Sequence, residues 1–560
     1  MLSYDKVRRI ALSTRWSVVC NSPLRLLGWN RETISHIHDM ATTPRPNADS
    51  FEITKRSVNY SSWYLDVIRA ADMIDQSSVR GCVVLKPWSM DIWEGIRFHL
   101  DMKIKEAGAK SVYFPLLIPV SLLSMEADHV DGFAKECAVI THHRLCSSPT
   151  QSNAAKSHSL IPDPTAELDE PLVVRPTSEA VIWTTFQKWI HSYRDLPLKI
   201  NQWSNVVRWE MRPRPFLRNS EFLWQEGHTA HSNESEAVSM AREMLDTYSS
   251  LCKNILALPV VKGTKSSSER FAGAVETFTI EGLMQNGWAL QCGTSHFLGT
   301  NFSRAFNVLY QDRDGDRQYT WATSWGVSTR LIGAVIMTHS DDVGLVLPPA
   351  IAPVQVVFVP IVNKNTPPES KAKICDALDT YVSMARSKGI RCEVDDRCDV
   401  RPGAKYYEWE RKGVPLRVTL GPKDIAHDVV SISNRVTGVE TKISANANTF
   451  ISTVESTLSD MQSLLYDRAK ERLDARTFRV NTYAEMKEML AETEGSAGKQ
   501  RGGFYLVPWK DSAENELRIK EDCKVTLRCF PDDYNKVAPT TKCFYCNEPA
   551  THFALFARAY

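Results

Sequence analysis

Apolar residues recur along the chain at spacings that predict both helices and strands. A helix ahead of Gly108 is predicted by four apolar positions at helical spacing, namely Trp93, Ile96, Leu100 and Ile104. We expect Ser89 to cap this helix and Gly108 to end it. A strand that contains Pro115 is predicted next, over residues 112–118.

Strands and helices continue to alternate in the region that follows. A strand is predicted to stop at a helix near Glu179, and Asn233 with Glu236 forms a capping box for a later helix. Residues 137–170 are rich in Ser, His, Pro and Thr, which is typical of a surface insertion.

Three closely spaced prolines mark a boundary near residue 353. Beyond it, the pattern predicts a strand, a helix and two further strands, over residues 354–362, 370–388, 391–394 and 415–420. This alternation indicates an α/β domain of about 100 residues. We therefore divide the chain into an N-terminal extension, a mixed α/β domain, this α/β domain, and a helical linker with a small terminal module, at residues 1–50, 51–353, 354–456 and 457–560.

Length and composition define the class of protein only broadly. The 560 residues are too many for one hydrophobic core and suggest about three or four domains. A hydrophobic fraction of 43% and a charged fraction of 24% are ordinary for a soluble protein. Because the net charge is only +1, an RNA partner would have to be held by a local basic surface.

Targeting signals are weak in this sequence. No apolar run approaches the roughly 20 residues that a membrane helix needs. The first 30 residues contain arginines among short apolar pieces, without the continuous apolar core of a secretory signal. The 13 cysteines are mostly scattered, as in reduced proteins. We expect a cytoplasmic protein, with an organelle transit peptide as the open alternative.

The sequence lacks the loop motifs that most often bind nucleotides, so a nucleotide would have to be bound by another structure. The chain has neither a G-x-x-x-x-G-K-[ST] phosphate loop nor a G-x-G-x-x-G fingerprint, and it lacks the HIGH and KMSKS signatures. A candidate device is the predicted hairpin over residues 208–228. Its Arg208, Glu210 and Arg218 could meet phosphates and a base, and Phe222 could stack on an adenine ring. The alternative is a charged hairpin that faces solvent.

Two further segments combine polar and apolar residues unusually. Arg330 opens an apolar helix after a strand and a glycine turn, so it is either paired in the core or holds an anion. The run from Gln291 to His296 places a carboxamide, a hydroxyl and an imidazole together, as a pocket floor would. A polar strand edge with a satisfied histidine explains that run equally well.

Together these segments resemble motifs 2 and 3 of class II aminoacyl-tRNA synthetases, and the helix and strand over residues 93–118 resemble motif 1. Within that class, four runs resemble prolyl-tRNA synthetases of the archaeal and eukaryotic type: Pro176-Thr-Ser-Glu179, Phe216-Leu-Arg218, Glu221-Phe-Leu-Trp-Gln-Glu-Gly-His228 and Gly293-Thr-Ser-His296. The resemblance covers residues 51–560. It implies an α/β multidomain fold, in which an antiparallel-sheet catalytic core is joined to an α/β anticodon-binding domain and a small α+β C-terminal domain.

The same resemblance implies residue roles. The catalytic residues would be Arg208 and Arg330. The residues facing proline would be Thr177, Glu179, Arg208, Trp224, Glu226, His228 and His296. The residues contacting ATP, together with Phe222 of the hairpin, would be Arg208, Glu210, Arg218, Asn219, Gln291, Thr294, Ser328 and Arg330. Gln291 would lie near Mg²⁺, and Asn219 stands where the family often has threonine. The anticodon would be read by Glu410, Arg417, Lys423 and Asp424, for any one of which a salt-bridged surface is an equal alternative.

The resemblance also implies cofactors and partners, and the sequence departs from the family pattern at one metal site. The family usually has a C-terminal zinc site, but this chain has Lys510 and Asn515 where two cysteines are expected. Since zinc takes four ligands, Cys543 and Cys546 are interpreted as a remnant and no metal site is assigned. The implied cofactors are ATP and Mg²⁺. The implied partners are L-proline, tRNA(Pro) and a second copy of the chain in a homodimer.

No long insertion separates Glu226 from Gln291, where bacterial members carry an editing domain, so we expect no cis-editing. Cysteine is close to proline in size, and we expect measurable mis-activation of it. Two rival readings remain. One is a class II synthetase for threonine or glycine. The other is a non-catalytic synthetase-like module that binds tRNA or a protein, although such modules usually lose phosphate-binding arginines.

Overall fold

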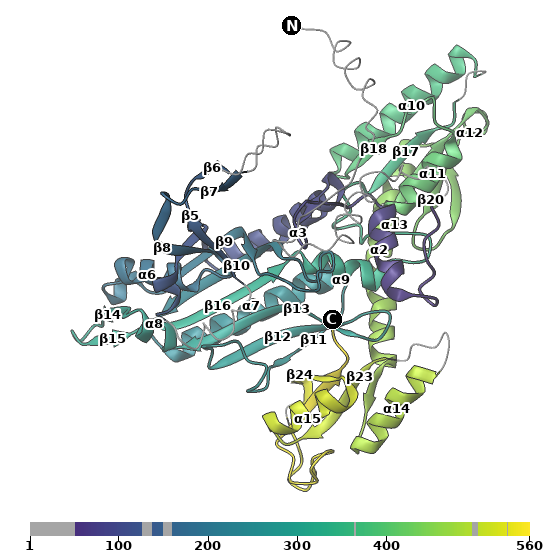
Figure 1. Cartoon of the computed structure of the whole chain (residues 1–560). Coiled ribbons are helices and arrows are strands. Elements are labelled where there is room, and N and C mark those ends of the chain that lie inside the picture. The colour runs from purple at the N-terminus through teal and green to yellow at the C-terminus, as the bar shows by residue number, and fades with distance from the viewer. Residues whose placement is uncertain (1–50, 126–136, 149–159, 363–365, 496–501, 535) are drawn as a thin grey trace, which may run out of the picture. The chain divides into compact units, whose positions relative to one another are not determined.

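The structure of the chain is a computed structural model (Figure 1) that describes residues 51–125, 137–148, 160–362, 366–495, 502–534 and 536–560. The residues from Ile53 to Tyr560 form one compact unit. The predicted N-terminal extension, residues 1–50, lies outside the described residues. Among the helices that the structure describes, none combines the length and the apolar character needed to cross a bilayer.

The centre of this unit is a large sheet built around six strands. Each of these strands is antiparallel to its neighbours within the group, in the order β11-β12-β13-β16-β10-β9. In chain order they are β9 (Leu198–Val207), β10 (Glu221–His231), β11 (Val260–Thr264), β12 (Glu276–Leu283), β13 (Ala289–Gly299) and β16 (Trp321–Ser328). An antiparallel sheet core is therefore confirmed. The strands can be followed in teal in Figure 1.

A long helix and a shorter one pack on this sheet. In α7 (Glu234–Asn254), Asn233 caps the first turn by accepting a hydrogen bond from the Glu236 backbone N–H, as predicted. The apolar face of α7 packs on β12, β13 and β16. The buried helix α9 (Arg330–His339) begins at Arg330, also as predicted. The remaining elements of this region are α2 (Tyr60–Ala70), β1 (Ile74–Gln76), β2 (Val83–Leu85), α3 (Pro87–Glu106), β3 (Lys110–Ser111), β4 (Leu117–Pro119), α4 (Val120–Leu123), α6 (Glu179–Trp189), α8 (Asn301–Ala305), β14 (Leu309–Gln311) and β15 (Arg317–Tyr319).

Two local predictions were wrong. Ser89 does not cap α3, because Pro87 already occupies the first turn and Lys86 stands at the cap position. The buried Ser89 hydroxyl instead donates to the Met73 carbonyl at 2.5 Å. Of the strand predicted over 112–118, only Leu117 and Ile118 belong to a strand, β4, since Pro115 has no N–H to donate to a neighbouring strand.

The segment over residues 137–170 is more than a surface insertion. Its described part forms β5 (Ala138–His142), β6 (Leu145–Ser147), β7 (Leu160–Pro162) and the start of β8 (Glu167–Val174). Strands β4, β8 and β5 make a three-stranded sheet, and β6 pairs with β7. The polar composition that suggested a loop reflects strands with one exposed face.

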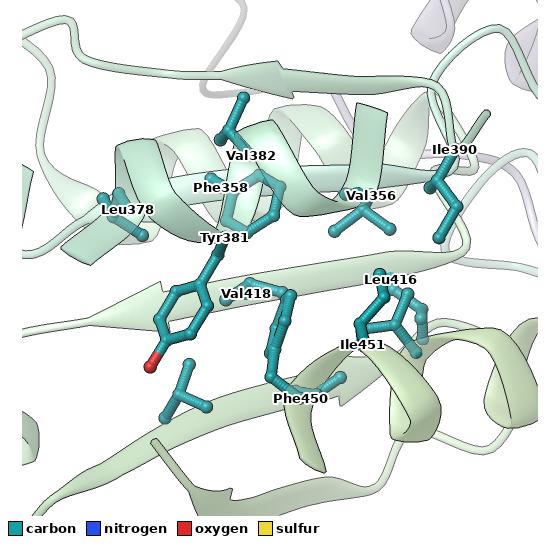
Figure 2. Close-up of a cluster of buried hydrophobic side chains, with 14 of the residues drawn as sticks. Val356, Phe358, Leu378, Tyr381, Val382, Ile390, Leu416, Val418, Phe450 and Ile451 are labelled. Atoms are coloured by element: carbon teal, nitrogen blue, oxygen red, sulfur yellow. The ribbon is translucent and has the colours of Figure 1, made fainter. Parts of the chain in front are cut away.

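The α/β pattern after the prolines was predicted correctly. A five-stranded sheet has the order β18-β17-β19-β20-β21. Its elements are β17 (Val356–Pro360), α10 (Pro368–Ser387), β18 (Cys392–Val394), α11 (Pro402–Arg411), β19 (Leu416–Leu420), α12 (Pro422–Ala426), β20 (Val429–Asn434), β21 (Glu440–Ser444) and α13 (Ala447–Ala475). Figure 2 shows its core, where Tyr381 of α10 meets Phe450 of α13 with ring centroids 4.4 Å apart.

The C-terminal part extends the large sheet. Its elements are β22 (Thr477–Arg479), α14 (Tyr483–Gly495), β23 (Phe504–Trp509), α15 (Ala513–Cys523), β24 (Thr526–Pro531) and β25 (His552–Ala557). Strand β24 pairs with β11 through Gly263 and Thr264, so the two sheets become one of eleven strands. The helical linker predicted from the sequence is two helices, α13 and α14, separated by β22.

A buried histidine at the end of α9 predicts sensitivity to acid. Burial lowers the pKa of His339 to about 4, and its Nε2 lies 2.9 Å from the Leu256 carbonyl oxygen. Because the unfolded chain takes up this proton near pH 6.5, the folded state should lose about 2 kcal/mol of stability between pH 7 and pH 5 through this group. His339→Gln keeps a donor for Leu256 but cannot titrate.

Between pH 7 and pH 5, we expect the free energy of unfolding of the wild type to fall by about 2 kcal/mol more than that of His339→Gln. Urea unfolding at pH 7 and pH 5 measures the difference, and the other histidines cancel because both proteins contain them. Parallel pH profiles for the two proteins would show that His339 does not carry the effect.

Candidate active site

A cavity of about 300 Å³ lies on the large sheet, between the start of α6, the hairpin of β9 and β10, and the start of α9. Most of the residues singled out in the sequence line it: Thr177, Glu179, Arg208, Phe222, Trp224, Glu226, His228, Gln291, Thr294, His296, Ser328 and Arg330. Segments far apart in the chain meet here because β10 and β13 both pair with β16. The antiparallel core thus places all three sequence segments around one cavity.

A close approach between strands shapes the floor of the cavity. Gly227 of β10 lies opposite Trp325 of β16, and a Cβ at position 227 would meet the indole ring at 2.0 Å. The missing side chain lets the indole lie flat against β10. Gly227 is therefore needed for the packing of Trp325 beneath the pocket. The sequence did not predict this role, because Gly227 simply stands between two pocket residues, Glu226 and His228.

One end of the cavity is strongly cationic. Arg208 follows β9 directly, and its Nε donates to the Pro176 carbonyl at 3.0 Å. Its guanidinium lies 5.6 Å from the ring centroid of Phe222 and 5.4 Å from that of Trp224. These contacts hold the planar cation at the cavity wall, where it can meet an anion.

Arg330 supplies the second cation. Its Nε donates to the Leu217 carbonyl at 3.2 Å, and its Nη1 donates to the Gln291 carbonyl at 3.4 Å. Burial, together with the charges of Arg208 and Arg218, lowers the pKa of Arg330 to about 10. The side chain is still protonated at neutral pH. Three arginines that repel one another around a cavity are the arrangement expected for binding phosphate groups.

The opposite wall is a buried network of acids and donors. Glu226 is only 3% exposed and accepts a hydrogen bond from the Ser178 hydroxyl at 2.5 Å. Gln202 also donates to Glu226, and His228 Nε2 lies 3.1 Å from its carboxylate. Beside this group, the Thr177 hydroxyl donates to Glu179. A wall of carboxylates held by neutral donors suits a small cationic ligand.

Several functional positions escaped sequence reasoning. Gln202 accepts from the Phe114 backbone N–H at 2.9 Å while its amide nitrogen donates to Ser178 and Glu226, so it orients the acidic wall. Phe271 stacks on His296 with ring centroids 4.4 Å apart, and Thr277 bonds the same imidazole at 3.0 Å. A lone glutamine in a strand and a phenylalanine in a loop carry no local signal of such roles.

Three predicted ATP contacts lie outside the cavity lining. Glu210 accepts from the Arg212 backbone N–H at 2.7 Å, and Arg218 is exposed on the loop between β9 and β10. Asn219 is 7% exposed, and its side-chain oxygen has no hydrogen-bond partner among the described residues. All three sit on the loop that borders the cationic end, next to the lining but not in it.

The α/β domain has a small pocket of about 30 Å³. Glu410 and Arg417 line it, together with Tyr406, Trp409, Ser433 and Arg435 among others. Lys423 and Asp424 are not part of this lining. Asp424 instead caps α12 by accepting from the Gly421 backbone N–H at 3.0 Å, and it pairs with Lys442 at 3.1 Å.

The residues near Cys543 do not fit a zinc ion. Lys510 forms an ion pair with Glu548, whose backbone carbonyl accepts from the Cys543 N–H at 2.7 Å. Lys510 stands at a sequence position where the family has a ligand cysteine, and its ammonium offers no lone pair to a metal. Within the described part of the chain, no group of three or more His, Cys, Asp or Glu residues could hold a metal ion.

Three family models match the chain. The tRNA synthetase class II core domain (G, H, P, S and T) matches residues 163–339, the anticodon binding domain matches 355–456, and the prolyl-tRNA synthetase C-terminal model matches 496–560. The antiparallel core and its cavity thus define a class II aminoacyl-tRNA synthetase.

Relatives narrow the assignment. The proline–tRNA ligases of Phocaeicola vulgatus and Porphyromonas gingivalis are each 48% identical, over 91% of this chain and 99% of their own lengths. A crystal structure of prolyl-tRNA synthetase from Cryptosporidium parvum, complexed with halofuginone and AMPPNP, is 39% identical with a TM-score of 0.81. It covers 91% of this chain and 99% of the solved one. The chain belongs to the prolyl-tRNA synthetase family.

One part of the expectation is not supported. The sequence motifs suggested the archaeal and eukaryotic type of the family, but the relatives at 46–48% identity come from bacteria. The motifs around the cavity were sufficient to recognise the family. They do not separate its subtypes.

Proposed function

We propose that the chain activates L-proline with ATP and transfers it to the 3′ end of tRNA(Pro). In the first step a proline carboxylate oxygen attacks the α-phosphorus of ATP, and the bond to the leaving pyrophosphate breaks. In the second step a ribose hydroxyl of the terminal adenosine attacks the activated carbonyl, and AMP leaves. The observation that carries the proposal is that two arginines, Arg208 and Arg330, and two buried carboxylates, Glu179 and Glu226, line one cavity.

The geometry supports distinct roles for the two ends. Arg208 lines the cavity beside Trp224 and can bind the proline carboxylate and the α-phosphate, while Arg330 neutralises the outer phosphates. Glu179 and Glu226 are suited to the proline ammonium. No protein nucleophile is needed, because the attacking group belongs to the substrate.

The nucleotide site would be completed by residues from three elements. Phe222 is suited to stack on the adenine, and Ser328 and Thr294 can hydrogen-bond the nucleotide. Glu210, Arg218 and Asn219 border this end from the loop between β9 and β10. Mg²⁺ prefers oxygen ligands, and the lining supplies Glu269 and Gln291 for it beside substrate phosphates. The ion would neutralise charge on the phosphates and the leaving pyrophosphate.

The rest of the chain would bind the tRNA and a second copy. We assign residues 51–353 to catalysis, 354–456 to the anticodon and 457–560 to the C-terminal domain. Glu410 and Arg417, which line one pocket, are the residues best placed to read splayed anticodon bases, with Lys423 and Asp424 beside them. A cytoplasmic homodimer, with α3 at the interface, follows from the class II organisation.

We also propose that the enzyme lacks cis-editing and mis-activates cysteine. The described chain runs from Glu226 to Gln291 through α7, β11 and β12 alone. The bacterial relatives match over 99% of their own lengths, which leaves no room in them for an additional domain. Cysteine is close to proline in size, so pocket exclusion should be modest. Undetectable cysteine-dependent pyrophosphate exchange at saturating cysteine would rule this out.

The deciding experiment is ATP–pyrophosphate exchange with each of the 20 amino acids, in magnesium and with and without tRNA. We expect strong exchange with proline, weak exchange with cysteine, and background exchange with threonine and glycine. Strong exchange with threonine or glycine instead of proline would reassign the substrate. No exchange with any amino acid, from protein shown to be folded, would contradict catalysis and favour a binding module.

A further inference from the structure

A buried ion triad joins the C-terminal part to the catalytic sheet. Glu281 of β12 is fully buried and accepts hydrogen bonds from Lys265 Nζ at 2.9 Å and from Arg528 Nε and Nη2 at 3.1 and 3.0 Å. Lys265 follows β11, whereas Arg528 comes from β24. Burial raises the pKa of Glu281, but the charges of Lys265 and Arg528 outweigh it and keep the carboxylate ionised.

The triad continues toward the cavity through one hydroxyl. Thr279, two residues before Glu281 on β12, donates to the same carboxylate at 3.0 Å. Its oxygen in turn accepts from the Gln291 side-chain nitrogen at 3.4 Å. Glu281 and Gln291 are register partners across β12 and β13, beside a bulge, so these side chains share one face of the sheet. Gln291 lines the cavity, and its carbonyl accepts from Arg330.

Fold stability alone explains this triad poorly. Taking one carboxylate and two cations out of water costs about as much as their attraction returns, so apolar residues of similar volume would serve as well. A buried polar network instead specifies one arrangement of its members, since each hydrogen bond fixes the next side chain. Gln291, at one end of this series of hydrogen bonds, lines the cavity. Arg528, at the other end, comes from the C-terminal domain.

We propose that Arg528 is a positioning residue for the nucleotide site, acting through Glu281 and Thr279 on Gln291. Two donors from Arg528 fix one oxygen of the Glu281 carboxylate, and the other oxygen, which also accepts from Lys265, orients Thr279. The Thr279 hydroxyl then holds the amide nitrogen of Gln291, and the amide oxygen is left for the magnesium-bound nucleotide. The C-terminal domain thereby sets the affinity for ATP. This inference rests on the function proposed above.

The test separates ATP binding from proline binding in pyrophosphate exchange. Arg528→Met removes the bidentate contact. Thr279→Val keeps the ion triad and the side-chain shape but removes the bridging hydroxyl. For both variants we expect the KM for ATP to rise at least about fivefold, the value of one lost hydrogen bond, while the KM for proline changes less than about twofold. Arg528→Lys, which keeps the charge, should recover part of the loss.

The matched control is Arg518→Met, the same substitution in the same domain. Arg518 forms an exposed ion pair with Glu514 within α15, so its kinetics should equal those of the wild type. Melting temperatures of all variants show which are folded, and Thr279→Val decides the question if Arg528→Met does not fold. A wild-type KM for ATP in folded Thr279→Val, or an equal rise in both KM values, would overturn the proposal. Wild type that shows no proline-dependent exchange would refute the proposed function instead.

Discussion

Replacing Arg330 by methionine is expected to slow proline-dependent ATP–pyrophosphate exchange about a thousandfold, the scale on which a phosphate-binding arginine acts. The same change should leave the melting temperature of the free protein unchanged or about 2 °C higher. Arg330 is half-buried in the cavity lining, where desolvation lowers its pKa to about 10. Desolvation and the charges of Arg208 and Arg218 outweigh the favourable charge of Glu281, so the free enzyme holds a poorly compensated cation.

Methionine has similar length and no charge, so it relieves this cost while removing the contact to the outer phosphates. ATP with magnesium should raise the melting temperature of the wild type and leave that of Arg330→Met almost unchanged. Arg304→Met is the matched control, because Arg304 is exposed on α8 and lies outside the cavity lining. If Arg330→Met melted well below the wild type, Arg330 would serve the fold and not the ligand.

Much of the fold was predictable because its signals are local. The spacing of apolar residues, the cap at Asn233 and the start of the buried helix at Arg330 each depend on neighbours in the chain. The glycine turn predicted before Arg330 was wrong, because Gly326 lies within β16 and pairs with strands on both sides. The predictions failed where a residue distant in the sequence determines the local structure. Serine is a common residue at helix caps, but the Ser89 hydroxyl donates its hydrogen bond to the carbonyl of Met73, which lies outside the helix. In the segment over residues 137–170, β5 forms because β8 offers it an edge, and β6 forms by pairing with β7.

The site was predictable to a different degree. Arg208, Glu226, Gln291 and Arg330 stand in motifs whose residue types already indicate phosphate and ammonium binding. Sequence reasoning did not find Gln202, because its role arises only when β9 lies beside β10 and its amide meets Glu226 across the pair. Thr279 and Arg528 escaped for the same reason, since they act through hydrogen bonds between strands that are far apart in the chain.

The second large effect is expected at Arg208. Arg208→Ala should lower exchange with proline at least about a thousandfold, because the Arg208 guanidinium would align both the proline carboxylate and the α-phosphate. Arg208→Lys should recover only a small part. A lysine ammonium would keep the charge, but it cannot present two parallel donors or lie flat near Phe222 and Trp224, whose ring centroids are 5.6 and 5.4 Å from the guanidinium.

Arg212→Ala is the matched control, since Arg212 is exposed on the same loop and does not line the cavity. It should exchange like the wild type in an assay without tRNA. Loss of exchange in Arg208→Ala alone, with the melting temperatures of the three proteins equal, would place the chemistry at the end of β9. Equal losses in both variants would mean that the loop between β9 and β10 needs its arginines for its shape, and the catalytic role would then pass to Arg330.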